Sequence, residues 1–395
     1  MKKLLKNIEG DKTIWAVVAL LAIISFMPVY SASTNLVYVA NTGTPISHLV
    51  KHAILLFFGF LIIYAVHKMP YRYFSGMSLL ALPLVFILLI YTLSQGTTIN
   101  GANASRWITI PFIGVGFQTS TLAGVVLMVY VARYLARNKD KAITFKQSIV
   151  PLWLPVAVIL LTILPANFST TAILFAMVLL IAFVGGYPLK YIASVVGIGV
   201  LVLTLFVLTA KAFPNVLPNR VDTWISRVEN FSTKDAEEGY QVEKAKIAIA
   251  SGGIYGRGAG KSVQKNFLPQ SSSDFIFAII VEEYGLLGAA ATILLYFLLT
   301  FRILIAAKKA ESIFATLLVL GVGLPIVFQA LINMAVAVNL FPVTGQTLPL
   351  ISSGGTSIWM TCFAIGIILT VTVNKKKEEN LNEENPLHVL HETIG

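Results

Sequence analysis

Long apolar runs recur along the chain, and short polar connections separate them. Most of these runs approach the ~20 residues that an α-helix needs to cross the hydrocarbon core of a bilayer. We therefore predict an all-α, polytopic membrane protein with about ten transmembrane helices. The predicted spans are residues 13–32, 49–67, 74–95, 117–136, 149–165, 169–186, 190–212, 275–301, 311–339 and 355–373.

One polar stretch, residues 213–274, is much longer than the other connections and lies between the seventh and eighth predicted spans. We interpret it as a large extracytoplasmic loop. Within it, the segment YQVEKAKIAIASGG, residues 240–253, has apolar positions at helical spacing and predicts a further helix. That helix either lies on the outer membrane surface or covers the top of the bundle, and the sequence supports the two placements equally.

Lysine and arginine residues gather in the connections on the side of the N-terminus, as in HKMPYRYF, RYLARNKDKAITFK and NKKKEEN. Cytoplasmic loops carry this excess in membrane proteins, so both termini are predicted to be cytoplasmic. We divide the chain into a transmembrane domain, residues 1–374, and a cytoplasmic tail, residues 375–395. The tail has the composition of a solvated segment and is a candidate for disorder.

Composition supports a membrane protein and excludes other classes. The chain has 395 residues, of which 56% are hydrophobic and 12% charged, and its mean hydropathy is +0.81, which is far too apolar for a soluble protein. Its net charge of +11 is spread over short loops facing anionic lipid, so nucleic-acid binding is not predicted. Cys362 is the single cysteine, which excludes a disulfide within the chain. His48 and His52 lack a third ligand nearby, so no metal site is predicted.

The stretch SGGIYGRGAGKS, residues 251–262, looks like a nucleotide-binding phosphate loop. That motif requires four residues between its first glycine and the Gly-Lys-Ser, whereas only three separate Gly256 from Gly260. No β-strand is predicted before it, and the charge asymmetry places it on the outer face. We therefore reject nucleotide binding and expect the glycines to turn the chain sharply at the membrane surface.

Four blocks of sequence resemble the SEDS family (FtsW, RodA and SpoVE), multi-span glycan polymerases of the bacterial cell wall. The blocks are DKTIWAVVALLAIISFMPVYSAS, NGANASRWITIPFIGVGFQTS, YQVEKAKIAIASGGIYGRGAGKSVQKNFLPQSSSDFIFAIIVEEYGLLG and INMAVAVNLFPVTGQTLPLISSGGTS. The resemblance covers nearly all of the predicted spans, and the opening Tyr-Ser-Ala-Ser favours the cell-division member FtsW over RodA. Two departures stand out: Thr121 and Gly124 replace a usual Glu and Lys, and Asn167 replaces a usual acid.

The resemblance implies an inverting glycosyltransferase that polymerises lipid II into peptidoglycan, releases undecaprenyl pyrophosphate and serves septal wall synthesis in cell division. It also implies a class B penicillin-binding protein as transpeptidase partner, contact with other divisome proteins and membrane lipids, and location in the bacterial inner (plasma) membrane. No cofactor is predicted with certainty, and a divalent cation, Mg²⁺ or Mn²⁺, stays open. Alternative functions are a lipid II flippase, or a RodA-type elongation polymerase.

The resemblance makes Asp274 the catalytic residue, a general base for the attacking sugar hydroxyl, although the residues alone favour a helix cap there. Glu282 and Glu283, inside the next span, are structural or cavity acids. The candidate substrate-binding residues are Arg106, Trp107, Gln118, Tyr240, Gln241, Arg257, Lys261, Lys265, Ser353 and Thr356. Solvated surface charges explain the basic members of this set, and helix caps explain its hydroxyls, if the resemblance is set aside.

Overall fold

The computed structural model describes residues 8–40, 43–95, 98–99, 102–103, 106–109, 116–141, 143–212, 224, 237–268 and 271–383. In this part of the chain, eight helices are long and apolar enough to cross a membrane, and two shorter apolar helices, Phe168–Val184 and Ser357–Val373, accompany them. Each of the predicted spans therefore contains an apolar helix. The chain is a multi-pass membrane protein, while the exact number of ten spans stays a prediction.

The helices alternate with tight turns, and two short β-pairs interrupt the outer connection after α4. In chain order the elements are α2 Lys12–Ala40, α3 Pro45–Val66, α4 Arg72–Ser94, β1 Thr98–Ile99, β2 Ala102–Asn103, β3 Trp107–Thr109, β4 Gly116–Gln118, α5 Thr119–Arg137, α6 Phe145–Ser148, the π-helical turn Ile149–Trp153, α7 Leu154–Ile163, α8 Phe168–Val184, α9 Leu189–Ala212, α11 Glu237–Gly252, the 3₁₀ turn Gln264–Asn266, α12 Ile276–Lys308, α13 Ile313–Ala337 and α14 Ser357–Glu383. Strand β1 pairs with β2 and β3 with β4, both antiparallel. The sequence did not predict these strands.

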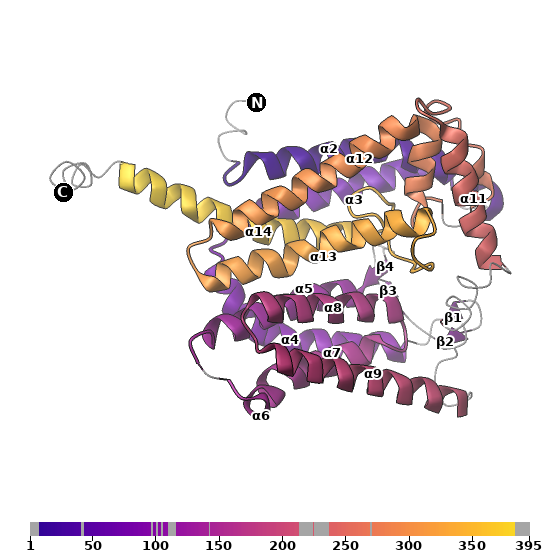
Figure 1. Ribbon diagram of the computed structural model, residues 1–395. Helices are drawn as coiled ribbons and strands as arrows, with labels where there is room; N and C mark the ends of the chain where they lie inside the picture. The colour runs from indigo at the N-terminus through magenta and orange to yellow at the C-terminus, as the bar shows by residue number, and fades with distance from the viewer. Residues whose placement is uncertain are drawn as a thin grey trace.

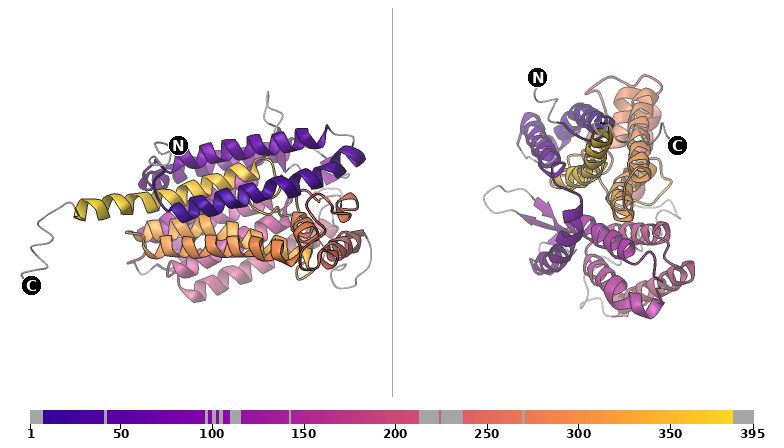
Figure 2. Two further views of the ribbon diagram at one scale, coloured as in Figure 1. Left: turned by 90° about the horizontal axis from the view of Figure 1, so that it is seen from above. Right: turned by 90° about the vertical axis from the view of Figure 1, so that its left-hand side faces the viewer.

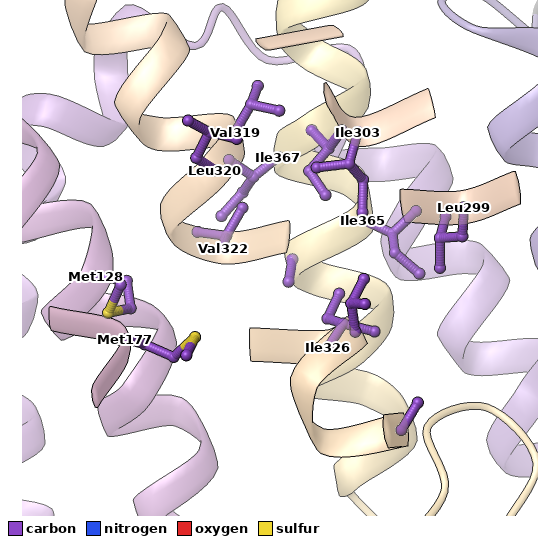
Figure 3. Packing of buried hydrophobic residues seen from close by; sticks show 14 of the residues in the cluster. Met128, Met177, Leu299, Ile303, Val319, Leu320, Val322, Ile326, Ile365 and Ile367 are labelled. Carbon is purple, nitrogen blue, oxygen red and sulfur yellow. The ribbon is translucent and has the colours of Figure 1, made fainter. Parts of the chain in front are cut away.

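The helices form two groups that are joined along α13. Viewed along the bundle, α2, α3, α12, α13 and α14 gather on one side, and α4, α5, α7, α8 and α9 on the other (Figure 2, right). Helix α13 packs against α5 and α8 as well as against α12 and α14. At this junction Met128 of α5 and Met177 of α8 face the α13 side chains Leu320 and Val322 (Figure 3), and all four are buried. Close van der Waals packing holds transmembrane helices together, because lipid offers no hydrophobic driving force.

The two ends of the bundle differ. The start of α2 and the far end of α14 lie at one end, and α11 and the short strands lie at the other (Figure 1). This arrangement agrees with both termini lying on one side of the membrane. Helix α14 runs on through residues 375–383, which the sequence assigned to the tail, and projects beyond the bundle. Residues 384–395 lie outside the described part of the chain.

Helix α11 packs on the outer end of the bundle. Its buried residues Val242, Ala245 and Ala248 form an apolar cluster with side chains of α12 and α13, among them Ile279 and Val336. The apolar face predicted from residues 240–253 is thus covered by protein. Of the two placements that the sequence left open, the structure has the helix that covers the bundle.

Helix α12 is broken at Gly285, whose φ of 67° and ψ of −162° are not helical. The glycine-rich segment after α11 crosses the break and bonds to both sides of it: the N–H of Arg257 donates to Glu282 O (2.9 Å), and the N–H of Leu286 donates to Gly253 O (2.9 Å). A Cβ on Gly285 would lie 2.2 Å from Ile254 O, so only glycine fits there. The crossing segment therefore satisfies backbone groups that the break would otherwise leave unpaired within the membrane.

Candidate active site

Asp274 lies at the outer end of α12, in a tight turn that begins at Ser271. Without the resemblance, the sequence favoured Asp274 as the N-cap of α12. In the structure the N-cap is the next residue, Phe275. The Asp274 Oδ2 atom lies 3.6 Å from the position that a Cβ on Gly345 would take. Gly345 has a φ of +67°, so the backbone passes beside the carboxylate in a conformation that favours glycine.

Hydrogen bonds from two sides hold the turn that carries Asp274. From α13, the Asn333 Nδ2 donates to Asp274 O (2.8 Å) and also to Gln346 O (2.7 Å). From the connection before α14, Ser352 Oγ donates to Ser273 O (2.6 Å), and Ser353 donates to the turn through its hydroxyl at 3.0 Å. The position of Asp274 is thus set by α13 and by the segment that follows it, as well as by its own helix.

A cavity of about 650 Å³ lies between α8, α9 and α13. Its wall is mainly apolar, and includes Met177 of α8, Leu203 of α9 and Ile332 of α13. Its other lining residues are Arg106, Asn167, Phe168, Ser169, Ala172, Ile173, Ala176, Val207, Trp224, Phe328, Phe341, Pro342, Val343 and Thr344. Thr344 is the neighbour of Gly345, so one end of the cavity reaches the segment that passes Asp274.

Arg106 is the one charged residue among the described residues that line this cavity. Its Nε donates to Ala166 O at 2.7 Å, which fixes the guanidinium next to the start of α8. Asn167 caps α8 by accepting a hydrogen bond from the N–H of Thr170 (3.3 Å). Among its described lining residues, the cavity therefore combines a long apolar wall with a cation and has no carboxylate, which suits an anionic head on an apolar chain.

The predicted basic residues Arg257, Lys261 and Lys265 lie elsewhere, and none of them lines the cavity. They belong to the glycine-rich segment, which folds around Glu282 and Glu283 of α12. Lys265 Nζ donates to Ser31 Oγ of α2 (3.0 Å) and to Gly260 O (2.8 Å), while Arg257 lies 3.9 Å from the Glu282 carboxylate. The structure thus separates these three cations from Arg106.

Glu282 and Glu283 are buried, with 0% and 1% of their surface exposed. The Glu282 carboxylate accepts hydrogen bonds from the N–H groups of Val263 (3.0 Å) and Gln264 (3.2 Å) and from the hydroxyl of Ser262. Glu283 accepts from the hydroxyl of Ser31 and from the N–H of Ser262 (3.3 Å). Successive backbone N–H groups make such an anion-binding concavity in phosphate loops. Here the chain's own carboxylate fills it, and the two acids tie the segment to α12.

The remaining predicted residues form contacts within the fold. Thr356 is fully buried, and its hydroxyl donates to Gly116 O and accepts from the N–H of Gln118, both at 3.1 Å. Trp107 packs on Gly116, whose Cβ would meet its ring at 3.3 Å. Tyr240 and Gln241 lie on α11 and do not line the cavity. The structure therefore ties Ser353 to the turn that carries Asp274 and puts Arg106 in the wall of the cavity, while the other candidates lie outside both.

The sequence did not single out Asn333, Gln346 or Gln329, although all three lie at the site. Asn333 is 1% exposed within the apolar helix α13, and Gln329, one turn earlier, donates to Thr347 O (2.9 Å). A polar residue in the middle of an apolar span was the signal that could have found Asn333. A second, small cavity of about 90 Å³ is lined by Gln329, Gln346 and Thr121 among others, and none of its described lining residues is charged.

The described side chains near Asp274 do not form a dedicated metal site. Among the described residues, no three His, Cys, Asp or Glu side chains gather closely enough to hold a metal ion. Asp274 supplies a single carboxylate, whereas a divalent cation held by the protein alone requires several oxygen ligands. A Mg²⁺ or Mn²⁺ ion held jointly by one carboxylate and a substrate pyrophosphate stays a prediction.

Comparison with known proteins identifies the family. Residues 11–377 match the family of FtsW, RodA and SpoVE, described as "Cell cycle protein". This chain belongs to the FtsW/RodA/SpoVE family. Its curated relatives include a "Probable peptidoglycan glycosyltransferase FtsW" from Thioalkalivibrio sulfidiphilus, 33% identical over 90% of this chain and 86% of the relative. A protein of the same name from Enterococcus hirae is 30% identical over 96% of both chains.

Two solved structures have the same fold as this chain. One, from a study of the coordination of polymerization and crosslinking by a peptidoglycan synthase complex, has a TM-score of 0.69 and 23% identity over 92% of this chain and 97% of that chain. The crystal structure of the rod shape determining protein RodA from Thermus thermophilus has a TM-score of 0.64 and 23% identity, and covers 92% of this chain and 96% of that chain. The SEDS resemblance seen in the sequence is therefore confirmed.

Proposed function

We propose that this chain is a peptidoglycan glycosyltransferase that polymerises lipid II into glycan strands and releases undecaprenyl pyrophosphate. Family membership and the names of its curated relatives, which are glycosyltransferases of the FtsW type, support this function. The same names support a role in septal wall synthesis during cell division. The alternative within the family is a role in cell elongation, as for a RodA-type polymerase.

The observation that carries the proposal is the position of Asp274 beside Gly345, whose neighbour Thr344 lines the apolar cavity. A lipid II donor has a long apolar chain, an anionic pyrophosphate and a sugar, in that order. The cavity of about 650 Å³ offers an apolar wall and the guanidinium of Arg106, and it lies within the range of about 300–1,000 Å³ that is typical of ligand sites. With the chain along the wall and the pyrophosphate at Arg106, the reacting sugar comes near Asp274.

In the proposed reaction, Asp274 accepts the proton of the acceptor's GlcNAc 4-hydroxyl as its oxygen attacks the anomeric carbon of the donor's MurNAc. The bond from that carbon to the pyrophosphate oxygen breaks, and its electron pair leaves with undecaprenyl pyrophosphate. Arg106 stabilises the charge that develops on the leaving group. One displacement converts an α-linked donor into a β-linked product, so inversion requires no carboxylate nucleophile. Asn333 contributes by fixing the backbone of Asp274.

The test compares purified wild type with Asp274→Ala, and with Asp140→Ala as a matched control, because Asp140 is an exposed acid in the turn after α5. Each protein receives lipid II, with and without a class B penicillin-binding protein, and glycan strands are resolved on a gel. We expect strands from the wild type and the control alone. Strands from Asp274→Ala would contradict the catalytic assignment, and scrambling of labelled lipid II without strands from the wild type would favour a flippase.

We further propose that the chain works in the bacterial plasma (inner) membrane with a class B penicillin-binding protein. The apolar helices support a multi-pass location, and the solved structure from a peptidoglycan synthase complex supports a partner of this class. Co-purification of the two full-length proteins from membranes tests the pairing. A partner that is lost in mild detergent and does not raise polymer yield would contradict it.

A further inference from the structure

A second polar cavity lies at the opposite end of α12 from Asp274. Its volume is about 310 Å³, at the lower limit of typical ligand sites. It is bounded by the start of α2, the last turns of α12 and the end of the apolar part of α14. Its lining residues are Gly10, Asp11, Lys12, Thr13, Arg302, Ile305, Ala306, Lys309, Val371 and Thr372. The positive-inside pattern places this end at the cytoplasmic membrane surface.

The one acid of this cavity is already fully engaged. Asp11 Oδ1 accepts hydrogen bonds from the N–H groups of Thr13 (2.8 Å) and Ile14 (3.4 Å). Its Oδ2 forms an ion pair with Arg302, which donates from Nε at 2.8 Å and also from Nη2. Only 7% of the Asp11 side chain is exposed. The carboxylate and the guanidinium therefore neutralise each other and close the inner wall of the cavity.

Lys12 and Lys309 remain at its rim as two exposed cations, and no carboxylate among the described residues pairs with either of them. Lys12 also lies in the first turn of α2, where the positive end of the helix dipole makes a lysine unfavourable. A bound anion would pair with both ammonium groups and offset the unfavourable interaction of Lys12 with the helix dipole. The cavity thus carries a net charge of about +2, since its lining has three cations and one acid.

The apolar residues of the lining indicate what kind of anion fits. Ile305 and Ala306 of α12 and Val371 of α14 form one side of the cavity. A free phosphate gains nothing from contact with an apolar wall, whereas the glycerol and acyl portions of a phospholipid pack against such a wall. We propose that this cavity binds the phosphate headgroup of an anionic phospholipid of the inner leaflet, with the phosphate on Lys12 and Lys309 and the glycerol against Ile305 and Val371.

The test measures lipid retention on the purified full chain by native mass spectrometry. Phosphatidylglycerol, phosphatidylcholine and inorganic phosphate are supplied in separate arms to the wild type, to K12A/K309A and to K12R/K309R. The control is K139A/K141A, which removes two exposed lysines from another cytoplasmic turn that does not line the cavity. Asp11 and Arg302 stay unchanged, because they join α2 to α12.

We expect the wild type to retain phosphatidylglycerol over phosphatidylcholine, and K12A/K309A to retain it about thirtyfold less well, because each of the two cations near an anionic headgroup contributes about 1 kcal/mol. The control and the arginine double variant should match the wild type. Equal losses in K12A/K309A and K139A/K141A would mean general surface attraction and would overturn the site. Inorganic phosphate bound as tightly as the lipid, or no preference for the anionic lipid in the wild type, would also overturn it.

Discussion

Asn333 is predicted to position Asp274 without contacting substrate, and replacing it with leucine tests this role. Leucine keeps a similar volume and removes the amide whose Nδ2 donates to Asp274 O (2.8 Å) and Gln346 O (2.7 Å). Each of the two carbonyls is part-buried, so losing this partner costs about 1 kcal/mol each, the lower end of the range for an unsatisfied group. Asn333 Oδ1 is itself buried with no partner among the described residues, so its removal offsets part of that cost. We expect a net loss of stability of about 1–2 kcal/mol.

The effect on rate should be larger than the effect on stability. Without the amide, the turn before α12 can relax, and a displacement of about 1 Å at a reacting group costs roughly 10²-fold in rate. The apolar cavity and Arg106 stay in place, so lipid II binding should change little. Asn333→Leu should therefore lower kcat by about 10²-fold and leave KM nearly unchanged. Initial rates of glycan-strand formation over a range of lipid II concentrations give the two constants.

Gln329→Leu is the matched control. Gln329 is an amide on the same helix, one turn earlier, and it ties the same connection through Thr347 O at 2.9 Å without bonding to Asp274. Its loss should lower the melting temperature about as much as the loss of Asn333, with a far smaller change in kcat. A wild-type kcat in Asn333→Leu, or an equal fall in both variants, would refute the positioning argument.

Three further outcomes follow from the structure. Arg106→Ala should lower the rate of polymerisation by about 10²-fold, because a preorganised cation near the leaving group is lost. A wild-type rate in the lipid II assay would show that Arg106 does not act in the site. Gly285→Ala should prevent accumulation of folded protein, because its Cβ would lie 2.2 Å from Ile254 O; normal yield and a normal melting temperature would show that the break tolerates a side chain. Glu282→Gln should weaken charge-assisted hydrogen bonds worth about 1.5–3 kcal/mol each and speed proteolysis within residues 253–265. Unchanged cleavage would contradict its role as an anchor.

Much of the helical fold could be predicted from the sequence, because an apolar run of membrane length leaves few alternatives. The helix within residues 240–253 was predicted for a similar reason, its apolar face. The strands after α4 were not, since two or three residues carry no periodic signal. The break at Gly285 was missed because its cause is tertiary: residues 253–258 cross α12 there and supply the hydrogen bonds.

The roles of the site residues stay predictions. The resemblance to a family pointed to Asp274 and Arg106; Arg106 lines the cavity, and Asp274 lies beside Gly345, whose neighbour Thr344 lines it. The same reasoning placed Arg257 and Lys261 near a pyrophosphate, yet they lie away from the cavity, in a segment whose N–H groups bind Glu282. Sequence spacing could not reveal this, because the acid that fills the concavity comes about 20 residues later in the chain.

The most direct test of the central claim is the rate of glycan-strand formation by Asp274→Asn at saturating lipid II. Asparagine keeps the shape of the side chain and removes its ability to accept the proton. The account predicts a fall of about 10²–10⁴-fold relative to wild type, the usual contribution of general base catalysis, with an unchanged melting temperature. A wild-type rate in Asp274→Asn would contradict the assignment of Asp274 as the base.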